Sequence, residues 1–171
     1  MLRVYRKTAH QIEKENNERT VWQKFHLKPV SPCYILTDNG EKIDISELSE
    51  KQILSICTRA LTQHANDRSD EDIFAAYRLT EALKGYYEPS YDGLKTIIGL
   101  YQNDNQTIRS HAHDLFTPLV DEKLREINTI AKFLQESKGN YEAPTYDQML
   151  QVIDQQIKNE QNKRHDNTMN Q

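Results

Sequence analysis

A turn motif that occurs twice constrains the fold of this chain more than any other feature. The sequence reads KGYYEPSYD at residues 84–92 and KGNYEAPTYD at residues 138–147, where one alanine is inserted. In each copy, glycine can end a helix in the left-handed conformation, proline blocks its continuation, and Ser or Thr caps the next helix. Apolar residues at helical spacing flank both copies, so we predict a duplicated helical hairpin with repeat units at about 69–102 and 118–158. Chance similarity between two turns of like chemistry is the alternative.

Helix start and stop signals predict about five helices. Ser49 and Gln52 have the spacing of a capping box, which reciprocally satisfies two free backbone N–H groups. The signals place the helices from Ser49 to about residue 64, from Ser69 to Gly85, after residues 89–90, from Thr117–Pro118 to Gly139, and after residues 144–145, with a short extra helix at 107–115. A further capping box, formed by Thr8 and Gln11, predicts a short helix near the N-terminus.

Residues 33–45 predict a β-hairpin. Two β-prone runs flank Asn39-Gly40, a residue pair that tolerates the positive φ angles of a type I′ turn. Because an isolated hairpin is marginal in water, we expect it to pack on a helix or to pair with a third strand, from residues 2–5 or around Val21.

These elements define a mainly α fold, a compact bundle of about five helices with one N-terminal β-hairpin. At 171 residues the chain has the length of one domain. We divide it into a basic N-terminal arm (1–30), a single helical domain (31–163) and a polar tail (164–171) that lacks apolar periodicity and is expected to fray.

The basic arm carries seven Lys or Arg and three Glu, a charge of +4, whereas the rest of the chain carries −8. An arm of this kind can dock on the acidic surface of its own chain. The alternative is contact with nucleic acid through Arg3, Arg6 and Lys7, but an acidic body would repel phosphates. The self-docked arm is therefore favoured.

The sequence lacks the motifs that define several classes of protein. The five glycines form no phosphate-binding loop, and neither the P-loop, the dinucleotide-binding nor the serine-hydrolase motif occurs. The two cysteines, Cys33 and Cys57, lack the spacing of a zinc or redox site and indicate reduced thiols. No stretch has the roughly 18 apolar residues of a membrane span or the pattern of a signal peptide. We expect a cytoplasmic protein with no membrane partner, cofactor or metal.

The dipeptide His113-Asp114 in a helical chain loosely resembles the HD-domain metal phosphohydrolases. The resemblance implies a metal site that also needs an upstream histidine and a downstream aspartate. The residues available for these two positions are His64 and Asp121, Asp147 or Asp154. None has a supporting motif, so the HD-like hydrolase is kept as the enzyme alternative.

Tyrosine is unusually frequent and gathers at the two repeated turns. Tyrosine offers a large apolar area with a polar tip, which favours interfaces, although it also seals helix corners. The partner-binding hypothesis rests on five tyrosines: Tyr86, Tyr87, Tyr91, Tyr141 and Tyr146.

We therefore expect a non-catalytic regulatory protein that binds another macromolecule: an adaptor, inhibitor, chaperone or assembly factor. A protein partner is favoured over nucleic acid, and self-association stays open. Low glycine with frequent Asn, Gln, Lys and Ile favours a bacterial or phage source.

Overall fold

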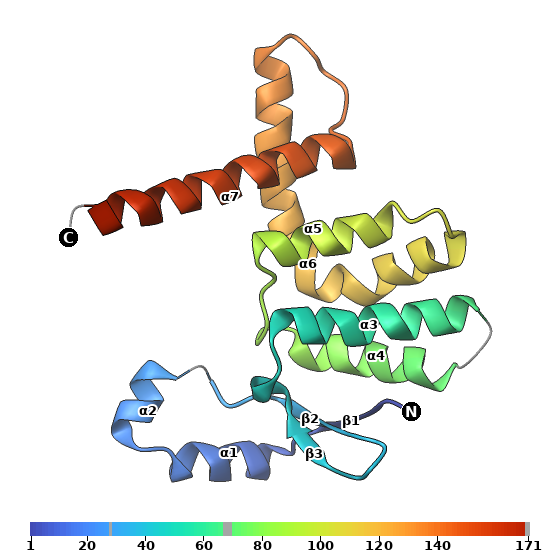
Figure 1. Cartoon of the computed structure of the whole chain (residues 1–171), viewed down its shortest axis with the longest axis vertical. Coiled ribbons are helices and arrows are strands. Elements are labelled where there is room, and N and C mark those ends of the chain that lie inside the picture. Colours follow the sequence, from blue (N-terminus) through green and yellow to red (C-terminus); the bar gives the residue numbers. More distant parts are fainter. Residues whose placement is uncertain (28, 67–69, 170–171) are drawn as a thin grey trace.

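The structure, a computed structural model, describes residues 1–27, 29–66 and 70–169. It is mainly helical, with a small sheet near the N-terminus (Figure 1). The elements are β1 (Arg3–Arg6), α1 (Ala9–Glu18), α2 (Val21–His26), β2 (Cys33–Leu36), β3 (Lys42–Asp44), a 3₁₀ turn (Ile45–Glu47), α3 (Glu50–Ala65), α4 (Glu71–Leu83), α5 (Tyr91–Tyr101), α6 (Gln106–Ser137) and α7 (Tyr146–Met169).

The predicted hairpin is present, and residues 3–6 supply its third strand. The sheet is antiparallel in the order β1-β2-β3, and Val4 pairs with Ile35 on the face that is buried against the helices. The turn differs from the prediction because Thr37 pairs with Glu41, which leaves a three-residue loop rather than a two-residue type I′ turn. Only one positive φ angle is then required, and Gly40 provides it at +79°.

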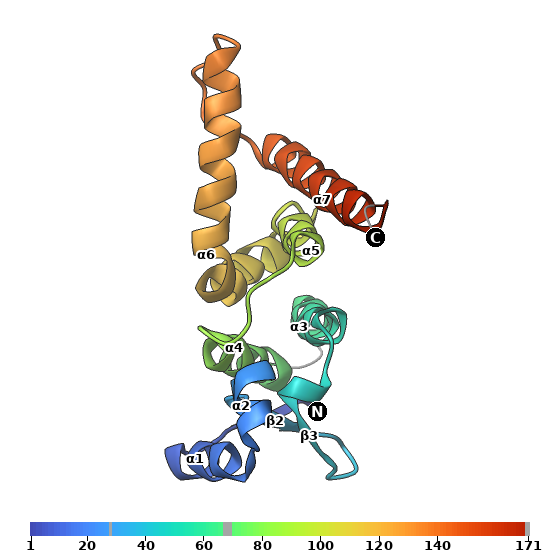
Figure 2. The ribbon, with the colours of Figure 1, turned by 90° about the vertical axis from the view of Figure 1, so that its left-hand side faces the viewer.

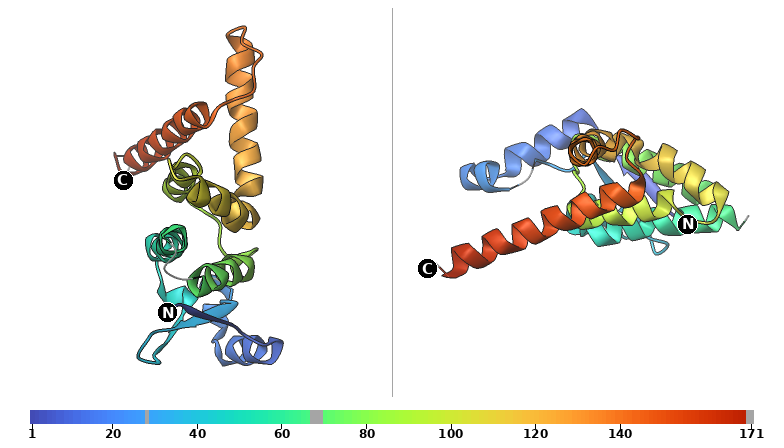
Figure 3. Two further views of the ribbon diagram at one scale, coloured as in Figure 1. Left: turned by 90° about the vertical axis from the view of Figure 1, so that its right-hand side faces the viewer. Right: turned by 90° about the horizontal axis from the view of Figure 1, so that it is seen from above.

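The helices stack in layers along the long axis of the molecule. Figure 3 shows the sheet with α1 at one end, then α3 and α4, then α5 with the first part of α6, and finally α7 against the second part of α6. Buried apolar side chains from all of these layers form one continuous core. This stack of layers is more elongated than the compact bundle that we predicted. The described residues contain seven α-helices rather than about five.

Local signals position most of the helix ends. The capping box of Ser49 and Gln52 forms with both hydrogen bonds, at 2.8 and 3.2 Å, and that of Thr8 and Gln11 begins α1. Ser90 caps α5. The predicted start of the second helix at Ser69 lies outside the described residues.

The prediction of separate helices on the two sides of Pro118 is wrong, because α6 runs through this residue. Figure 2 shows that α6 changes direction between its yellow first part and its orange second part, the stretch that contains Pro118. Proline removes one helical hydrogen bond and bends the helix. The Thr117 hydroxyl donates to the His113 carbonyl in the same stretch, and Phe116 and Val120 are both buried. Packing on both sides of the proline thus maintains the helix.

The repeated motif builds the same turn twice but does not build the same hairpin. Gly85 and Gly139 both have φ at +82°, and Ser90 and Thr145 both cap the helix that follows. However, α6 and α7 pack against each other, whereas α4 packs mainly against α3 and α6 and has no substantial contact with α5. The similarity is therefore one of turn chemistry, and a duplicated hairpin is not what these helices form.

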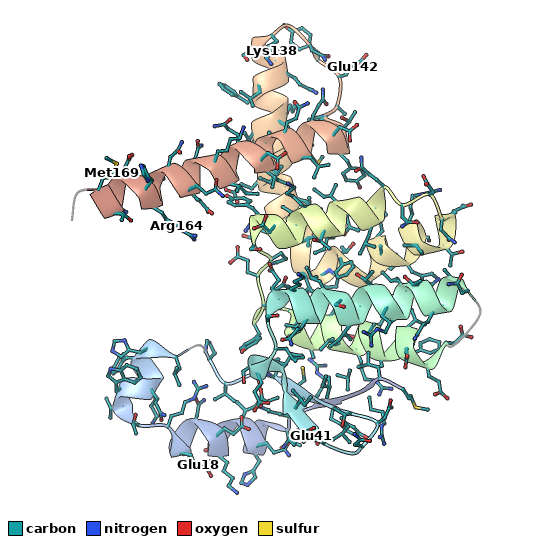
Figure 4. All side chains as sticks on the ribbon, in the orientation of Figure 1. Glu18, Glu41, Lys138, Glu142, Arg164 and Met169 are labelled. Carbon is teal, nitrogen blue, oxygen red and sulfur yellow. The ribbon has the colours of Figure 1, made fainter. Side chains whose placement is uncertain are left out.

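The polar tail is helical rather than frayed in the described residues, since α7 continues to Met169. The buried side chains of α7, Val152 and Ile153, lie in the first half of the helix. Figure 4 shows Arg164 and Met169 on the part of α7 that projects away from the other elements. Residues 158–169 contain Lys, Glu, Gln and Arg without Gly or Pro, a composition that lets a helix anchored at one end continue.

Candidate functional site

The most exposed group of apolar side chains lies on α2. A capping box of Thr20 and Gln23 begins this helix with hydrogen bonds of 2.8 and 3.1 Å. Trp22 is 64% exposed and Phe25 is 81% exposed, and α2 contributes no buried residue. We call the exposed side chains of this segment the α2 patch: Val21, Trp22, Phe25 and Leu27. Large apolar side chains that are exposed together on one short segment are typical of interaction sites in soluble proteins.

The segment that carries the α2 patch is fixed to the sheet by a buried lysine. The Lys7 side chain is 2% exposed, and its Nζ lies 2.5 Å from an Asp44 carboxylate oxygen and 2.7 Å from a Glu15 carboxylate oxygen. Nζ also donates to Ser31 Oγ at 2.8 Å. Glu15 lies on α1, so this contact connects α1 to the sheet, although α1 contributes no buried residue. The basic arm is thus docked on its own chain: Lys7 of the arm pairs with Asp44 of the body and with Glu15 of the arm itself.

A pocket of about 640 Å³ lies between the arm and the first repeated turn. Leu27 of the α2 patch and Pro29 line one side of the pocket, and Tyr86 and Tyr87 line another. In Figure 1, α2 lies at the outer end of the arm, away from the stacked helices. The α2 patch and this pocket therefore form adjoining parts of one surface.

A carboxylate beneath the pocket holds the first repeated turn in place. Glu50 accepts hydrogen bonds from the Tyr87 hydroxyl at 2.5 Å, from the Ser90 backbone N–H at 2.9 Å, and from the Ser90 hydroxyl. Burial alone would raise the pKa of Glu50, but these hydrogen bonds outweigh burial and lower it. Burial and the hydrogen bond to Glu50 raise the pKa of Tyr87. A Cβ atom at Gly93 would lie 2.7 Å from the Glu50 carboxylate, so a larger residue at this position would displace that carboxylate from its hydrogen bonds.

The predicted partner-binding tyrosines lie in several places. Tyr86 and Tyr87 are half-buried on the pocket wall, and Tyr91 lies beneath Lys123, whose Nζ is 4.5 Å from the ring centroid. Tyr146 packs near the Tyr101 ring, with centroids 5.9 Å apart. Tyr141 is exposed at the α6–α7 turn, whose tip is marked by Lys138 and Glu142 in Figure 4. Of the five, Tyr86 and Tyr87 adjoin the α2 patch.

The residues of the nucleic-acid alternative are divided by the structure. Arg3 and Arg6 are exposed on β1, and one Arg3 guanidinium nitrogen lies 3.3 Å from the Thr37 carbonyl oxygen. Lys7 is buried and ion-paired, as described above. The Lys7 charge is neutralised by carboxylates of the same chain. Of the three residues, Arg3 and Arg6 are therefore the ones accessible to a phosphate backbone.

The structure places the two histidines of the HD-like alternative in different contacts. His113 stacks on Tyr101 with ring centroids 3.9 Å apart, whereas His64 contacts His111 instead. The downstream aspartates have other partners: Asp121 pairs with Arg125, Asp147 accepts from Gln102, and Asp154 pairs with Lys95. Within residues 1–27, 29–66 and 70–169, no three His, Cys, Asp or Glu side chains gather in a way that holds a metal ion.

Comparison with known proteins found no matching family model, no matching curated protein and no matching solved structure. In the described part of the chain, no helix combines the length and the apolar character needed to cross a bilayer.

The sequence interpretation did not identify the α2 patch. A signal was present, because Thr20 and Gln23 have capping-box spacing and Trp22 and Phe25 lie three positions apart on the helix that the box begins. The helix has only six residues, so it is too short for a periodicity criterion.

Proposed function

We propose that this chain is a non-catalytic protein-binding protein, acting as an adaptor, inhibitor, chaperone or assembly factor, and that the α2 patch is its main contact. The observation that carries the proposal is the exposure of Trp22 and Phe25 on a helix that contributes nothing to the core. Trp and Phe are enriched among the residues that contribute most to binding at interfaces.

The area of these two side chains suits the centre of an interface, and surrounding surface must supply the rest of the contact. Together they present roughly 300 Å² of surface, which corresponds to about 7 kcal/mol of transfer free energy before the costs of association are subtracted. The adjoining pocket, with Tyr86 and Tyr87 on its wall, extends the surface toward the first repeated turn. A partner segment that covers Trp22 and Phe25 can thus insert a side chain beside Leu27.

The charge near the α2 patch defines the chemistry of the partner. Lys24 and His26 lie in the last turn of α2, next to the apolar side chains. Complementary charge at the rim of an interface speeds association and selects the partner. The proposed partner is therefore a second protein with an apolar groove that is bordered by acidic residues.

A site-specific cross-linking experiment tests this proposal. A photoreactive phenylalanine analogue is placed at Phe25 in one variant and at Phe133 in another, because Phe133 is 69% exposed but lies on α6, outside the α2 patch. After irradiation in an extract of the source cells, the Phe25 variant should form a cross-link to one protein that the Phe133 variant does not label. The same protein, purified, should cross-link again at Phe25.

Two outcomes contradict the proposal. Equal labelling from both positions would show that cross-linking follows exposure alone. Cross-links only to another copy of this chain, with a dimer mass in light scattering that Phe25→Ser converts to a monomer, would assign the α2 patch to self-association instead.

A further inference from the structure

Two histidines from different helices meet outside the surface proposed above. His64 lies near the end of α3 and His111 lies on α6, 47 residues later. Their Nε2 atoms are 3.1 Å apart, and the rings are nearly perpendicular, with centroids 4.5 Å apart. Neither the core nor the proposed interface explains this pair.

The second nitrogen of each ring already has a partner. His64 Nδ1 lies 2.8 Å from Asp70 Oδ1, and His111 Nδ1 lies 2.9 Å from the Tyr77 hydroxyl. Because a carboxylate only accepts hydrogen bonds, Asp70 fixes the proton of the neutral His64 ring on Nδ1, and in that form Nε2 carries a lone pair. Histidines that ligate metals typically have such a carboxylate or oxygen partner at their other nitrogen.

The state of His111 decides what lies between the two Nε2 atoms. If Tyr77 donates to Nδ1, His111 carries its proton on Nε2 and donates it to His64. If His111 instead donates from Nδ1 to the Tyr77 oxygen, the tyrosine proton can turn toward the His111 carbonyl oxygen, 3.5 Å away. Both Nε2 lone pairs then face the same space, where a bound cation would offset their repulsion. The pair changes between the two states without losing a proton.

The spacing of the two nitrogen atoms fits a shared metal ion. With metal–nitrogen bonds of about 2.05 Å, two imidazole nitrogens lie about 2.9 Å apart at a 90° angle and about 3.3 Å apart at the tetrahedral angle. The observed 3.1 Å falls between these values. Negative charge is also close. Asp70 contacts His64, and burial together with the negative charge of Asp114 raises the pKa of Tyr77, the partner of His111.

We propose that His64 and His111 form a two-histidine site for a divalent transition-metal ion of the Zn²⁺, Ni²⁺ or Cu²⁺ class. The chain supplies two nitrogen ligands and water completes the coordination, so binding is weaker than at a structural site with four protein ligands. Imidazole ligands give Cu²⁺ the highest affinity and Ni²⁺ and Zn²⁺ lower ones. The bound ion would link α3 directly to α6, and it would not involve His113.

Titration of the metal-free full chain with Ni²⁺ by calorimetry tests this site. The wild type should bind one ion per chain, and His64→Gln and His111→Gln should each weaken binding at least tenfold. His113→Gln provides the matched control, because it makes the same change on the same helix and should leave the affinity within twofold. Circular dichroism verifies that each variant is folded.

A second measurement on the wild type does not depend on any variant. In ¹⁵N spectra of the imidazoles, Zn²⁺ should shift the Nε2 signals of two histidines, and the Nδ1 signals of the same two rings should then have the position of a protonated nitrogen. Absence of Ni²⁺ binding by the wild type overturns the proposal, and so does equal binding by the His64→Gln/His111→Gln double variant. A tenfold loss in folded His113→Gln would also overturn it, because the ion would then lie elsewhere.

Discussion

Replacing Lys7 with methionine tests whether the buried lysine fixes the arm to the sheet. Methionine keeps the apolar stem of the side chain but removes the ammonium group. Asp44 and Glu15 then lose their counter-ion, and Ser31 loses its donor. The Lys7 side chain is 2% exposed, whereas those of Asp44 and Glu15 are 24% and 39% exposed, so the two carboxylates regain part of their hydration after the substitution.

The expected loss is about 2–3 kcal/mol of unfolding free energy at neutral pH. Removal of one member of a fully buried ion pair costs roughly 3–5 kcal/mol, and the partial exposure of both carboxylates moves the expected value to the bottom of that range or just below it. Lys14→Met is the matched control, since Lys14 is exposed on α1, and it should change the stability by less than about 0.5 kcal/mol.

The same contact predicts a pH dependence. Burial alone would raise the pKa of Asp44, but hydrogen bonds from Lys7, Ser31 and Ser46 outweigh it and lower the pKa from 3.8 to about 2. A folded-state pKa below that of the unfolded chain stabilises the protein above pH 3.8, and this contribution disappears as the pH falls through about 2. After allowance for exposure it amounts to roughly 1 kcal/mol, which Lys7→Met should reduce.

Urea unfolding at pH 7, 5, 4, 3 and 2, followed by circular dichroism, measures both effects. The wild type should lose stability more steeply between pH 4 and 2 than Lys7→Met. The reasoning is refuted if Lys7→Met costs no more stability than Lys14→Met. It is also refuted if the stability of Lys7→Met depends on acid pH in the same way as that of the wild type.

Three further substitutions test the packing of the helices, with urea unfolding as the measurement in each case. Gly93→Ala should destabilise the protein by about 1–2 kcal/mol because the new Cβ displaces Glu50, whereas Gly99→Ala, with nothing within 4 Å, should stabilise it by about 0.5–1 kcal/mol; a shift of the same sign for both contradicts this account. Tyr87→Phe removes the 2.5 Å hydrogen bond to Glu50 and should cost about 1–2 kcal/mol, so unchanged stability would show that the hydroxyl is not needed. Ile153→Ala should cost about 2–4 kcal/mol because the side chain is fully buried, and a loss typical of a surface position would show that α7 is not docked.

Elements with strong local signals could be predicted from the sequence. The capping boxes at Ser49 and Thr8 begin α3 and α1, and the sequence around Gly40 turns the hairpin even though the loop is one residue longer than expected. Each of these features depends on contacts between residues that are near in sequence.

Features that depend on distant contacts were predicted poorly. Pro118 is a local signal to end a helix, yet the burial of Phe116 and Val120 keeps α6 continuous. The contact between His64 and His111 joins positions 47 residues apart, which no local pattern indicates. The five tyrosines of the repeated turns were grouped by sequence position, whereas the structure distributes them among a pocket wall, a contact with Lys123, a contact with the Tyr101 ring and an exposed turn.

The affinity of the cross-linked partner for variants of the α2 patch tests the proposed function most directly. Calorimetry with purified partner compares the wild type with Trp22→Ser and with Phe74→Ser, because Trp22 and Phe74 are 64% and 66% exposed but Phe74 lies on α4. The account predicts that Trp22→Ser raises the Kd about 30-fold or more, equivalent to about 2 kcal/mol, while Phe74→Ser leaves it unchanged. Equal affinities for all three proteins would contradict it.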